Sequence, residues 1–154
     1  MRSGLYIGRF QPFHNGHLTV IMGALSEVDH LYIGIGSSNV LDGKNPFTFG
    51  QRKMMIEAAL DGIVCHSRFT VVAIPDFNDN EKWMAFIAET LPRPDVVFSG
   101  NQVVIDLFRV SGVPVRVLNV RYGGLSGTEI RRRMRSGVEW QSMVPAGVIG
   151  VITK

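Results

Sequence analysis

Two histidines three residues apart are the first side chains in the sequence whose type and spacing suggest chemistry. His14 and His17 lie in the segment GRFQPFHNGH, residues 8–17, directly after a short apolar run. If a helix begins here, its first turn points both imidazoles the same way, and its free N–H groups and dipole favour an anion. With Arg9 close by, the pair predicts a phosphate-binding site. The alternative is that the histidines only cap a helix or fill a polar pocket.

Other chemistries fit this segment less well. A zinc site needs more ligands, and no Cys, Asp or Glu accompanies the two histidines. We therefore expect no metal ion held by the protein's own side chains. The segment is not a Walker loop, because no Gly-Lys-Ser/Thr follows it. The sequence GIGSSN at residues 34–39 lacks the third glycine of the dinucleotide fingerprint, so we interpret it as a turn after a strand.

A second group of candidate residues lies in LSGTEIRRRM, residues 125–134. Ser126 or Thr128 can cap a helix there, and both could face one anion at its start together with Arg131, whose fork of N–H donors suits phosphate oxygens. Taken alone, the segment fits a capped, solvated basic helix at least as well. Its other arginines are expected at the surface or in subunit contacts.

The elements that must position these side chains follow from the alternation of apolar and helix-like stretches. Near-continuous apolar runs such as TVVAI and DVVFSG are typical of strands in a parallel sheet. The expected strands cover residues 4–8, 30–36, 69–75, 95–99 and 114–120. The expected helices cover residues 17–26, 48–61 (with Thr48 as N-cap), 80–91, 101–109 and 127–136, with a short last helix after Pro145. We predict an α/β fold, a three-layer αβα sandwich with a Rossmann-like open parallel five-stranded sheet, forming a single domain over residues 1–154.

Ligands of such a sheet bind beyond the carboxyl ends of its strands. The histidine segment follows the first strand and the Ser126–Arg131 segment follows the fifth. We therefore expect the two groups to converge on one pocket at the same edge of the sheet.

Composition limits the class of protein. Hydrophobic residues make up 45% of the 154 residues, which is too many for disorder. No apolar run approaches the roughly 20 residues of a membrane helix, no signal peptide is evident, and the single cysteine, Cys65, is expected to be a packing residue. We expect a cytoplasmic protein with no membrane partner. The net charge of +3 favours anionic partners, but no aromatic residues interleave with the basic ones, so we expect no nucleic-acid partner.

The two segments resemble known signatures. GRFQPFHNGH is similar to the His-x-Gly-His signature of the nucleotidyltransferase superfamily, and SGTEIR resembles its second signature. Four segments, GRFQPFHNGH, NPFTFGQR (45–52), SGN (99–101) and SGTEIRRRM, occur in the order found in the archaeal-type nicotinamide-nucleotide adenylyltransferases. The resemblance covers nearly the whole chain. It implies that an adenylyl group passes from ATP to nicotinamide mononucleotide (NMN), giving NAD and pyrophosphate by direct in-line attack.

The resemblance also implies roles for individual residues. His14 and His17 would bind ATP phosphates, with His17 at the α-phosphate, and Arg131 would hold the β and γ oxygens with help from Ser126 and Thr128. Further ATP-binding positions are Gly8, Arg9, Phe10, Gln11 and Arg52, the last reaching the triphosphate. Without the resemblance, Arg52 would be as well explained as an exposed helix residue.

For the acceptor, the resemblance implies NMN-binding roles for Asn80, Trp83 and Asn101. An aromatic face suits a flat, cationic pyridinium ring, although Trp83 could simply pack in the core beside Phe86 and Ile87. Mg²⁺ would be bound through the ATP phosphates, with few or no protein ligands, and a homo-oligomer is implied. Other acceptors stay open: nicotinate mononucleotide, FMN or pantetheine phosphate, or cytidylyl transfer from CTP. A more remote alternative is a non-catalytic nucleotide- or nucleic-acid-binding protein.

Overall fold

The computed structural model describes residues 1–118 and 124–154 and contains one parallel sheet. Its strands are β1 (Ser3–Gly8), β2 (His30–Gly36), β3 (Phe69–Ile74), β4 (Val96–Ser99) and β5 (Val115–Val117). They lie in the order β3-β2-β1-β4-β5, and every neighbouring pair is parallel. The predicted Rossmann-like α/β fold is thereby confirmed. Of the expected fifth strand, residues 119 and 120 lie outside the described residues.

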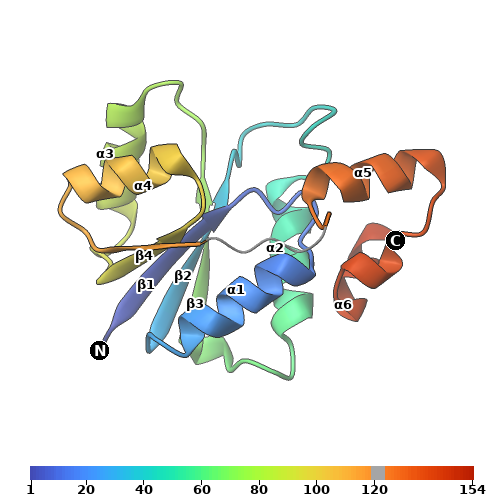
Figure 1. Cartoon of the computed structure of the whole chain (residues 1–154), viewed down its shortest axis with the longest axis horizontal. Coiled ribbons are helices and arrows are strands. Elements are labelled where there is room, and N and C mark those ends of the chain that lie inside the picture. Colours follow the sequence, from blue (N-terminus) through green and yellow to red (C-terminus); the bar gives the residue numbers. More distant parts are fainter. Residues whose placement is uncertain (119–123) are drawn as a thin grey trace.

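The helices follow the strands in alternation (Figure 1). They are α1 (Asn15–Leu25), α2 (Phe49–Leu60), α3 (Asn80–Thr90), α4 (Gln102–Val110), α5 (Gly127–Ser136) and α6 (Ala146–Ile152), with 3₁₀ turns at His66–Arg68 and Gln141–Met143. Side chains cap the first five, and the expected cap Thr48 is confirmed. Helix α1 begins two residues earlier than expected, because His14 itself is its N-cap.

The two faces of the sheet carry separate apolar cores, as strand alternation requires. On one face Tyr6 and Ile33 pack with buried residues of α1 and α2. On the other, Leu5 and Val97 pack with residues of α3 and α4. Figure 1 shows the two helix pairs on opposite sides of the strands. This arrangement is the predicted three-layer sandwich.

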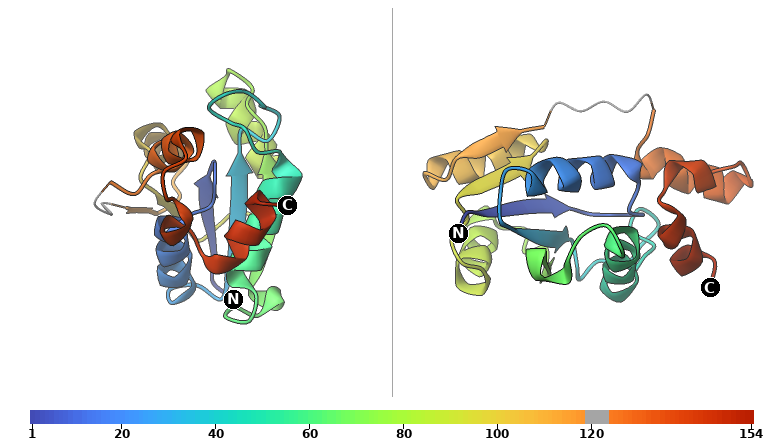
Figure 2. Two further views of the ribbon diagram at one scale, coloured as in Figure 1. Left: turned by 90° about the vertical axis from the view of Figure 1, so that its right-hand side faces the viewer. Right: turned by 90° about the horizontal axis from the view of Figure 1, so that it is seen from below.

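Helices α5 and α6 lie beyond the carboxyl end of β1, where the loops after the strands emerge (Figures 1 and 2). Helix α6 packs closely on α2: a Cβ added at Gly147 would lie 2.8 Å from the carbonyl oxygen of Ala58, so only glycine fits there.

One prediction about the surface is wrong. Cys65, expected to be a packing residue, is exposed. No helix among the described residues is long and apolar enough to cross a membrane.

Candidate active site

The first loop holds the two imidazoles face to face. The rings of His14 and His17 are stacked with centroids 3.6 Å apart. They form a reciprocal cap: His14 Nδ1 accepts from the main-chain N–H of Gly16 (3.1 Å) and of His17 (3.4 Å), while the main-chain N–H of His14 donates to His17 Nδ1 (3.0 Å). Behind them the ring of Phe10 meets the edge of His17, with centroids 4.7 Å apart. The imidazole positions are therefore fixed by the backbone and by packing.

These contacts determine the protonation of both rings. Because each Nδ1 accepts a main-chain N–H, the neutral imidazole carries its proton on Nε2 and can donate from there. Burial lowers the pKa of His14 from 6.5 to about 4. Burial, and then the neighbouring His14, hold the pKa of His17 well below its usual range. At neutral pH the pair thus presents two uncharged N–H donors to any ligand that reaches them.

The second predicted group lies against the first. Ser126 is the N-cap of α5, its Oγ accepting the main-chain N–H of Glu129 (3.1 Å). Arg131 Nη1 donates to the main-chain carbonyl of Gln11 (2.6 Å), and its Nη2 lies 3.4 Å from the hydroxyl of Thr128. Gly127 permits this approach, since a Cβ there would lie 3.1 Å from the Gln11 carbonyl oxygen. The expected convergence of the two segments is therefore present.

Between them lies a cavity of about 230 Å³ with a strongly positive lining. Its charged residues are Arg9, Lys44 and Arg131, and no described residue that lines it carries a carboxylate. Burial, followed by the charges of Arg9 and Arg135, lowers the pKa of the Arg131 guanidinium. The full lining is Arg9, Phe10, Gln11, His14, His17, Lys44, Gly127, Thr128 and Arg131. Two helix N-termini, neutral imidazole donors and three cationic side chains together make this cavity suited to a polyphosphate.

Arg52 does not line this cavity. It is completely buried, and its guanidinium donates to the carbonyls of Arg9 (2.9 Å), Gly36 (2.8 Å), Ser37 (3.3 Å) and Thr48 (3.2 Å). The interpretation of Arg52 as an exposed helix residue is therefore wrong, and the triphosphate contact that the resemblance implies stays a prediction. Three of these carbonyls, those of Arg9, Gly36 and Ser37, lie at or just after the ends of β1 and β2. The fourth belongs to Thr48, the N-cap of α2, so Arg52 ties the strand ends to this helix.

Gln11 and Phe10, for which the resemblance implies ATP contacts, also make contacts that shape the loop. The side-chain amide of Gln11 exchanges two hydrogen bonds with the main chain of Phe47 (3.0 and 2.9 Å). Phe10 is 1% exposed and adopts φ of +52°, a conformation that costs a non-glycine residue free energy. Both residues hold the loop in shape, while its backbone borders the cavity.

A second hollow, of about 380 Å³, adjoins the first and shares His14, His17 and Gly127 with it. Its other lining residues are Tyr6, Ile7, Gly16, Val20, Ser99, Gly100, Asn101, Leu118, Leu125 and Ser126. The larger apolar share of this lining suits a heterocyclic or sugar group rather than phosphates. Asn101 lies at its border and caps α4 through Oδ1, which accepts from Val103 and Val104.

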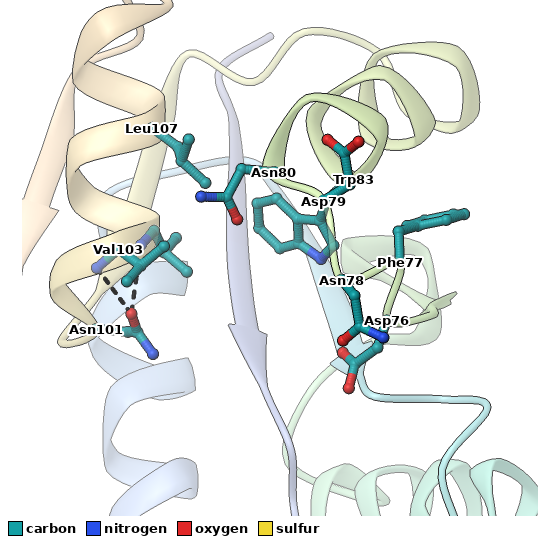
Figure 3. A pocket seen from close by; sticks show the side chains of 10 residues that line it. Asp76, Phe77, Asn78, Asp79, Asn80, Trp83, Asn101, Val103 and Leu107 are labelled. Atoms are coloured by element: carbon teal, nitrogen blue, oxygen red, sulfur yellow. Dashed lines mark hydrogen bonds between the residues drawn. The ribbon is translucent and has the colours of Figure 1, made fainter.

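A third hollow, of about 320 Å³, lies between α3 and α4 and shares Asn101 with the second (Figure 3). The indole of Trp83 and the amide of Asn80 point into it from α3. Trp83 is half-buried, and its ring meets Phe108 edge-on with centroids 6.2 Å apart, so it both packs on the core and faces the hollow. Asp76 and Asp79 also line it, together with Phe77, Asn78, Val103, Val104 and Leu107.

The three hollows are contiguous through shared residues, and they connect every predicted site residue except Gly8 and Arg52. Gly8 ends β1 directly before this loop, where a Cβ would lie 2.9 Å from the ring of Phe10.

Lys44 was not predicted from the sequence as a site residue. It sits in the turn at residues 42–45, where Asp42 Oδ1 accepts from the main-chain N–H groups of Lys44 and Asn45 (both 2.9 Å). The Asp-Gly-Lys-Asn sequence was a turn signal, but nothing in it placed the turn beside the histidines.

Comparison with known proteins gives a consistent result. The family model described as cytidylyltransferase-like matches residues 5–133. A nicotinamide-nucleotide adenylyltransferase of Methanocorpusculum labreanum is 44% identical, with 99% of this chain and 90% of that protein covered. One from Thermococcus onnurineus is 43% identical, with 96% and 80% covered.

The same fold occurs in solved structures. A bifunctional NMN adenylyltransferase/ADP ribose pyrophosphatase from Francisella tularensis superposes with a TM-score of 0.85 at 24% identity, covering 99% of this chain and 49% of that one. A structure of such a protein complexed with AMP and a Mn ion gives a TM-score of 0.76 at 27% identity, covering 93% and 44%. The chain thus spans about half the length of these two-activity proteins.

Proposed function

The chain belongs to the cytidylyltransferase-like family, among the nicotinamide-nucleotide adenylyltransferases, and we propose that it transfers the adenylyl group of ATP to NMN. An oxygen of the NMN phosphate forms a bond to the α-phosphorus of ATP. The bond from that phosphorus to the bridging oxygen of the β-phosphate breaks, and pyrophosphate leaves. The products are NAD and pyrophosphate. The observation that carries this proposal is the meeting of neutral imidazole donors and the Arg131 guanidinium around one cavity.

Catalysis of such a transfer needs alignment and charge stabilisation rather than a protein nucleophile. The β- and γ-phosphates fit the cavity between Arg9 and Arg131, at the N-terminus of α5 with Ser126 and Thr128. The α-phosphate then lies at the imidazole pair, where the first and second hollows meet. The Nε2–H of His17 donates to the oxygen on which negative charge grows in the transition state, and His14 holds a neighbouring oxygen.

The remaining parts of the substrates follow the hollows. The adenosine occupies the second hollow, beside Ser99, Gly100 and Asn101. The NMN lies toward the third, with its pyridinium ring on Trp83 and its carboxamide at Asn80. Stacking and cation–π attraction favour a cationic ring on an indole face.

A divalent cation such as Mg²⁺ would screen the charge of the triphosphate and of the departing pyrophosphate. The described lining of this cavity carries imidazole and guanidinium N–H groups and no carboxylate, so it suits phosphate oxygens better than a cation. Among the described residues no group of three His, Cys, Asp or Glu could hold one either. The ion therefore fits only on the phosphate oxygens and water, while the cavity binds the phosphates.

A panel of acceptors tests this function. Purified protein with ATP and Mg²⁺ is given NMN, nicotinate mononucleotide, FMN or pantetheine phosphate, and the pyrophosphate and dinucleotide formed are separated by anion exchange. NAD should form from NMN. If none of these acceptors led to release of pyrophosphate, the proposal would be overturned. If pyrophosphate were released only with an acceptor other than NMN, the substrate would have to be corrected.

A variant pair assigns the activity to this site. His17→Ala should lower kcat by about 10²–10³-fold, the usual effect of losing one transition-state donor. Thr19→Ala is the matched control: Thr19 lies one half-turn further along α1, is exposed, and bonds only to the carbonyl of Asn15 (3.1 Å) among described partners. Equal activities of the two variants would show that His17 has no catalytic role.

A further inference from the structure

A group of polar contacts joins the loops that follow β2 and β3, and we refer to Ser37, Asn39 and Asp76 as the loop clamp. The hydroxyl of Ser37 donates to the carboxylate of Asp76, 3.0 Å from each of its oxygens. Asn39 pairs with the main chain of Asp76 in both directions: its Nδ2 donates to the carbonyl (3.2 Å) and its Oδ1 accepts the N–H (2.8 Å). Both the backbone and the side chain of Asp76 are thus held.

The loop clamp acts on the segment that builds the third hollow. Asp76 begins the run Asp76-Phe77-Asn78-Asp79, which lines the hollow and leads into α3, where Asn80 and Trp83 lie. Within the run, Phe77 also packs against Phe86, with ring centroids 5.5 Å apart, and Asp79 caps α3. The run follows an edge strand, it is mostly exposed, and Asn78 adopts a strained φ of +54°. Figure 3 shows Asp76 at the border of the hollow, on the same side as the Trp83 ring.

The other end of the loop clamp is connected through Arg52 to the first cavity, between Arg9 and Arg131, which we call the polyphosphate cavity. The carbonyl of Ser37, whose φ is +50°, accepts from Arg52, and the same guanidinium holds the carbonyl of Arg9. Arg9 lines the first cavity and Asp76 lines the third. One continuous set of hydrogen bonds, Arg9–Arg52–Ser37–Asp76, therefore supports both regions where the two substrates are proposed to bind.

From this geometry we infer that Ser37, Asn39 and Asp76 are positioning residues for the mononucleotide acceptor; the inference rests on the proposed function. The loop clamp fixes the run 76–79 before the substrate arrives, so that Asn80 and Trp83 meet the acceptor already in place. Such preorganisation lowers the cost of ordering the loop on binding. A competing explanation is that the Asp76 carboxylate acts directly, by attracting the positive charge of the pyridinium ring.

Single substitutions measure the contribution of the loop clamp. Ser37→Ala and Asn39→Ala each remove side-chain hydrogen bonds to Asp76 and leave every lining residue of the third hollow unchanged. Each should raise the KM for NMN about five- to tenfold, as expected for losing hydrogen bonds that order a binding loop. The KM for ATP and the kcat should stay within about twofold, because the imidazole pair and Arg131 are untouched.

The variants Asp76→Asn and Asp76→Ala separate the hydrogen bond that Asp76 accepts from Ser37 from the negative charge of its carboxylate. Asparagine keeps a side-chain oxygen that accepts from Ser37 but has no charge, whereas alanine loses both. If Asp76 is a positioning residue, Asp76→Asn should bind NMN nearly as the wild type does and Asp76→Ala should resemble Ser37→Ala. Equal, large losses in both variants would overturn the inference in favour of direct charge attraction.

Ser3→Ala is a matched control at the other end of the sheet, where the Ser3 hydroxyl lies 3.5 Å from an oxygen of Asp95. It should leave both KM values unchanged. Quenching of tryptophan fluorescence by NMN without ATP gives the same affinities independently of turnover. The rate of the wild-type enzyme with NMN tests the proposed function. The loop clamp is tested separately, by the ratio of the variant KM to the wild-type KM, measured with the mononucleotide that the wild type uses. Unchanged ratios in an active enzyme would refute only the loop clamp.

Discussion

The guanidinium of Arg131 donates to the main-chain carbonyl of Gln11 over 2.6 Å, a bond between residues 120 positions apart. It joins the start of α5 to the loop before α1 and so closes one side of the polyphosphate cavity. A single guanidinium here has two proposed tasks, since Nη1 holds the loop while the same group lines the cavity and can donate to a phosphate. The same hydrogen bond therefore shapes the cavity and fixes the position of one of the cations that line it.

Two replacements of Arg131 should separate the contribution of its charge from that of its planar fork of donors. Arg131→Lys keeps a positive charge but loses the planar fork, so it should raise the KM for ATP and lower kcat/KM by about tenfold. Arg131→Ala loses both the charge and the fork, and kcat/KM should fall by about 10²–10³-fold. Steady-state kinetics with varied ATP measures both values.

Arg132→Ala is the control, because Arg132 is exposed and pairs with Glu129 (2.7 Å) on the outer side of the same helix. It should retain normal kinetics. Comparable losses in Arg131→Ala and Arg132→Ala would point to a general electrostatic effect of α5 rather than to a specific phosphate contact.

The acid stability of the protein should depend on His14. Its pKa is about 4 when folded and 6.5 when unfolded, so between these values the unfolded state binds a proton that the folded state does not. The stabilisation is therefore complete above pH 6.5 and is lost as pH falls toward 4, by on the order of 3 kcal/mol. Urea unfolding measured at half-unit steps of pH follows this loss.

His14→Asn keeps a side-chain acceptor at the N-cap but does not titrate, so its stability should decline less steeply between pH 6.5 and 4. The carboxyl groups with lowered pKa values, such as Glu129 at about 2, lose their contributions only as pH falls below 4.5. Parallel decline of wild type and variant over the histidine window would contradict the prediction.

Arg52 offers a direct test between a structural and a phosphate-binding role. Arg52→Ala removes the side-chain donor of four carbonyls and empties the space of a completely buried side chain, so it should destabilise the protein by about 3 kcal/mol. The KM for ATP should rise as a consequence, because Arg9 and the loop before α1 lose their support. Unfolding free energy and ATP kinetics are measured on the same preparation. A large rise in KM with unchanged stability would instead favour the phosphate contact implied by the resemblance.

Lys44 should contribute to binding of the outer phosphates. Lys44→Ala removes one of three cations that line the cavity and keeps the turn, which is ordered by main-chain bonds to Asp42. The KM for ATP and the inhibition constant of pyrophosphate should each rise about two- to fivefold, the range expected for an exposed charge contact. Lys53→Ala, which loses only a 3.8 Å pair with Glu57 on α2, should change neither.

The effect of Lys44 should also shrink as salt increases, because exposed charges are screened. An equal effect in 50 mM and 500 mM salt would show that Lys44 acts through the shape of the turn and not through its charge.

The sequence was sufficient for the fold and for the meeting of the two signatures. Strand and helix periods alternate clearly, and the carboxyl ends of parallel strands must share an edge, so His17 and Arg131 could be placed together without coordinates. The burial of Arg52 could not be predicted, because its partners are main-chain carbonyls near the ends of β1 and β2 and at the start of α2, and a pattern of side chains does not indicate such contacts. Lys44 and the Ser37–Asp76 contact were missed because they join loops with no periodicity. The expectation of a homo-oligomer stays a prediction.

The final prediction concerns the acceptor and rests on the position of Trp83. Its indole faces the third hollow and also packs on the core, where it forms a T-shaped pair with Phe108 (6.2 Å between centroids). Trp83→Ala should raise the KM for NMN by about tenfold or more, because stacking and cation–π attraction are lost together, and should leave the KM for ATP nearly unchanged. Trp83→Phe, which keeps an aromatic face, should lie between alanine and wild type.

Trp83→Ala also weakens the core beneath α3, so loss of packing must be separated from loss of stacking. Phe108→Leu removes the aromatic partner of Trp83 from within the core and does not alter the lining of the third hollow. It should lower the unfolding free energy by about 1 kcal/mol with little change in the KM for NMN. If Phe108→Leu weakened NMN binding as strongly as Trp83→Ala, or if Trp83→Ala raised both KM values alike, the indole would be a packing residue and the nicotinamide ring would have to bind elsewhere.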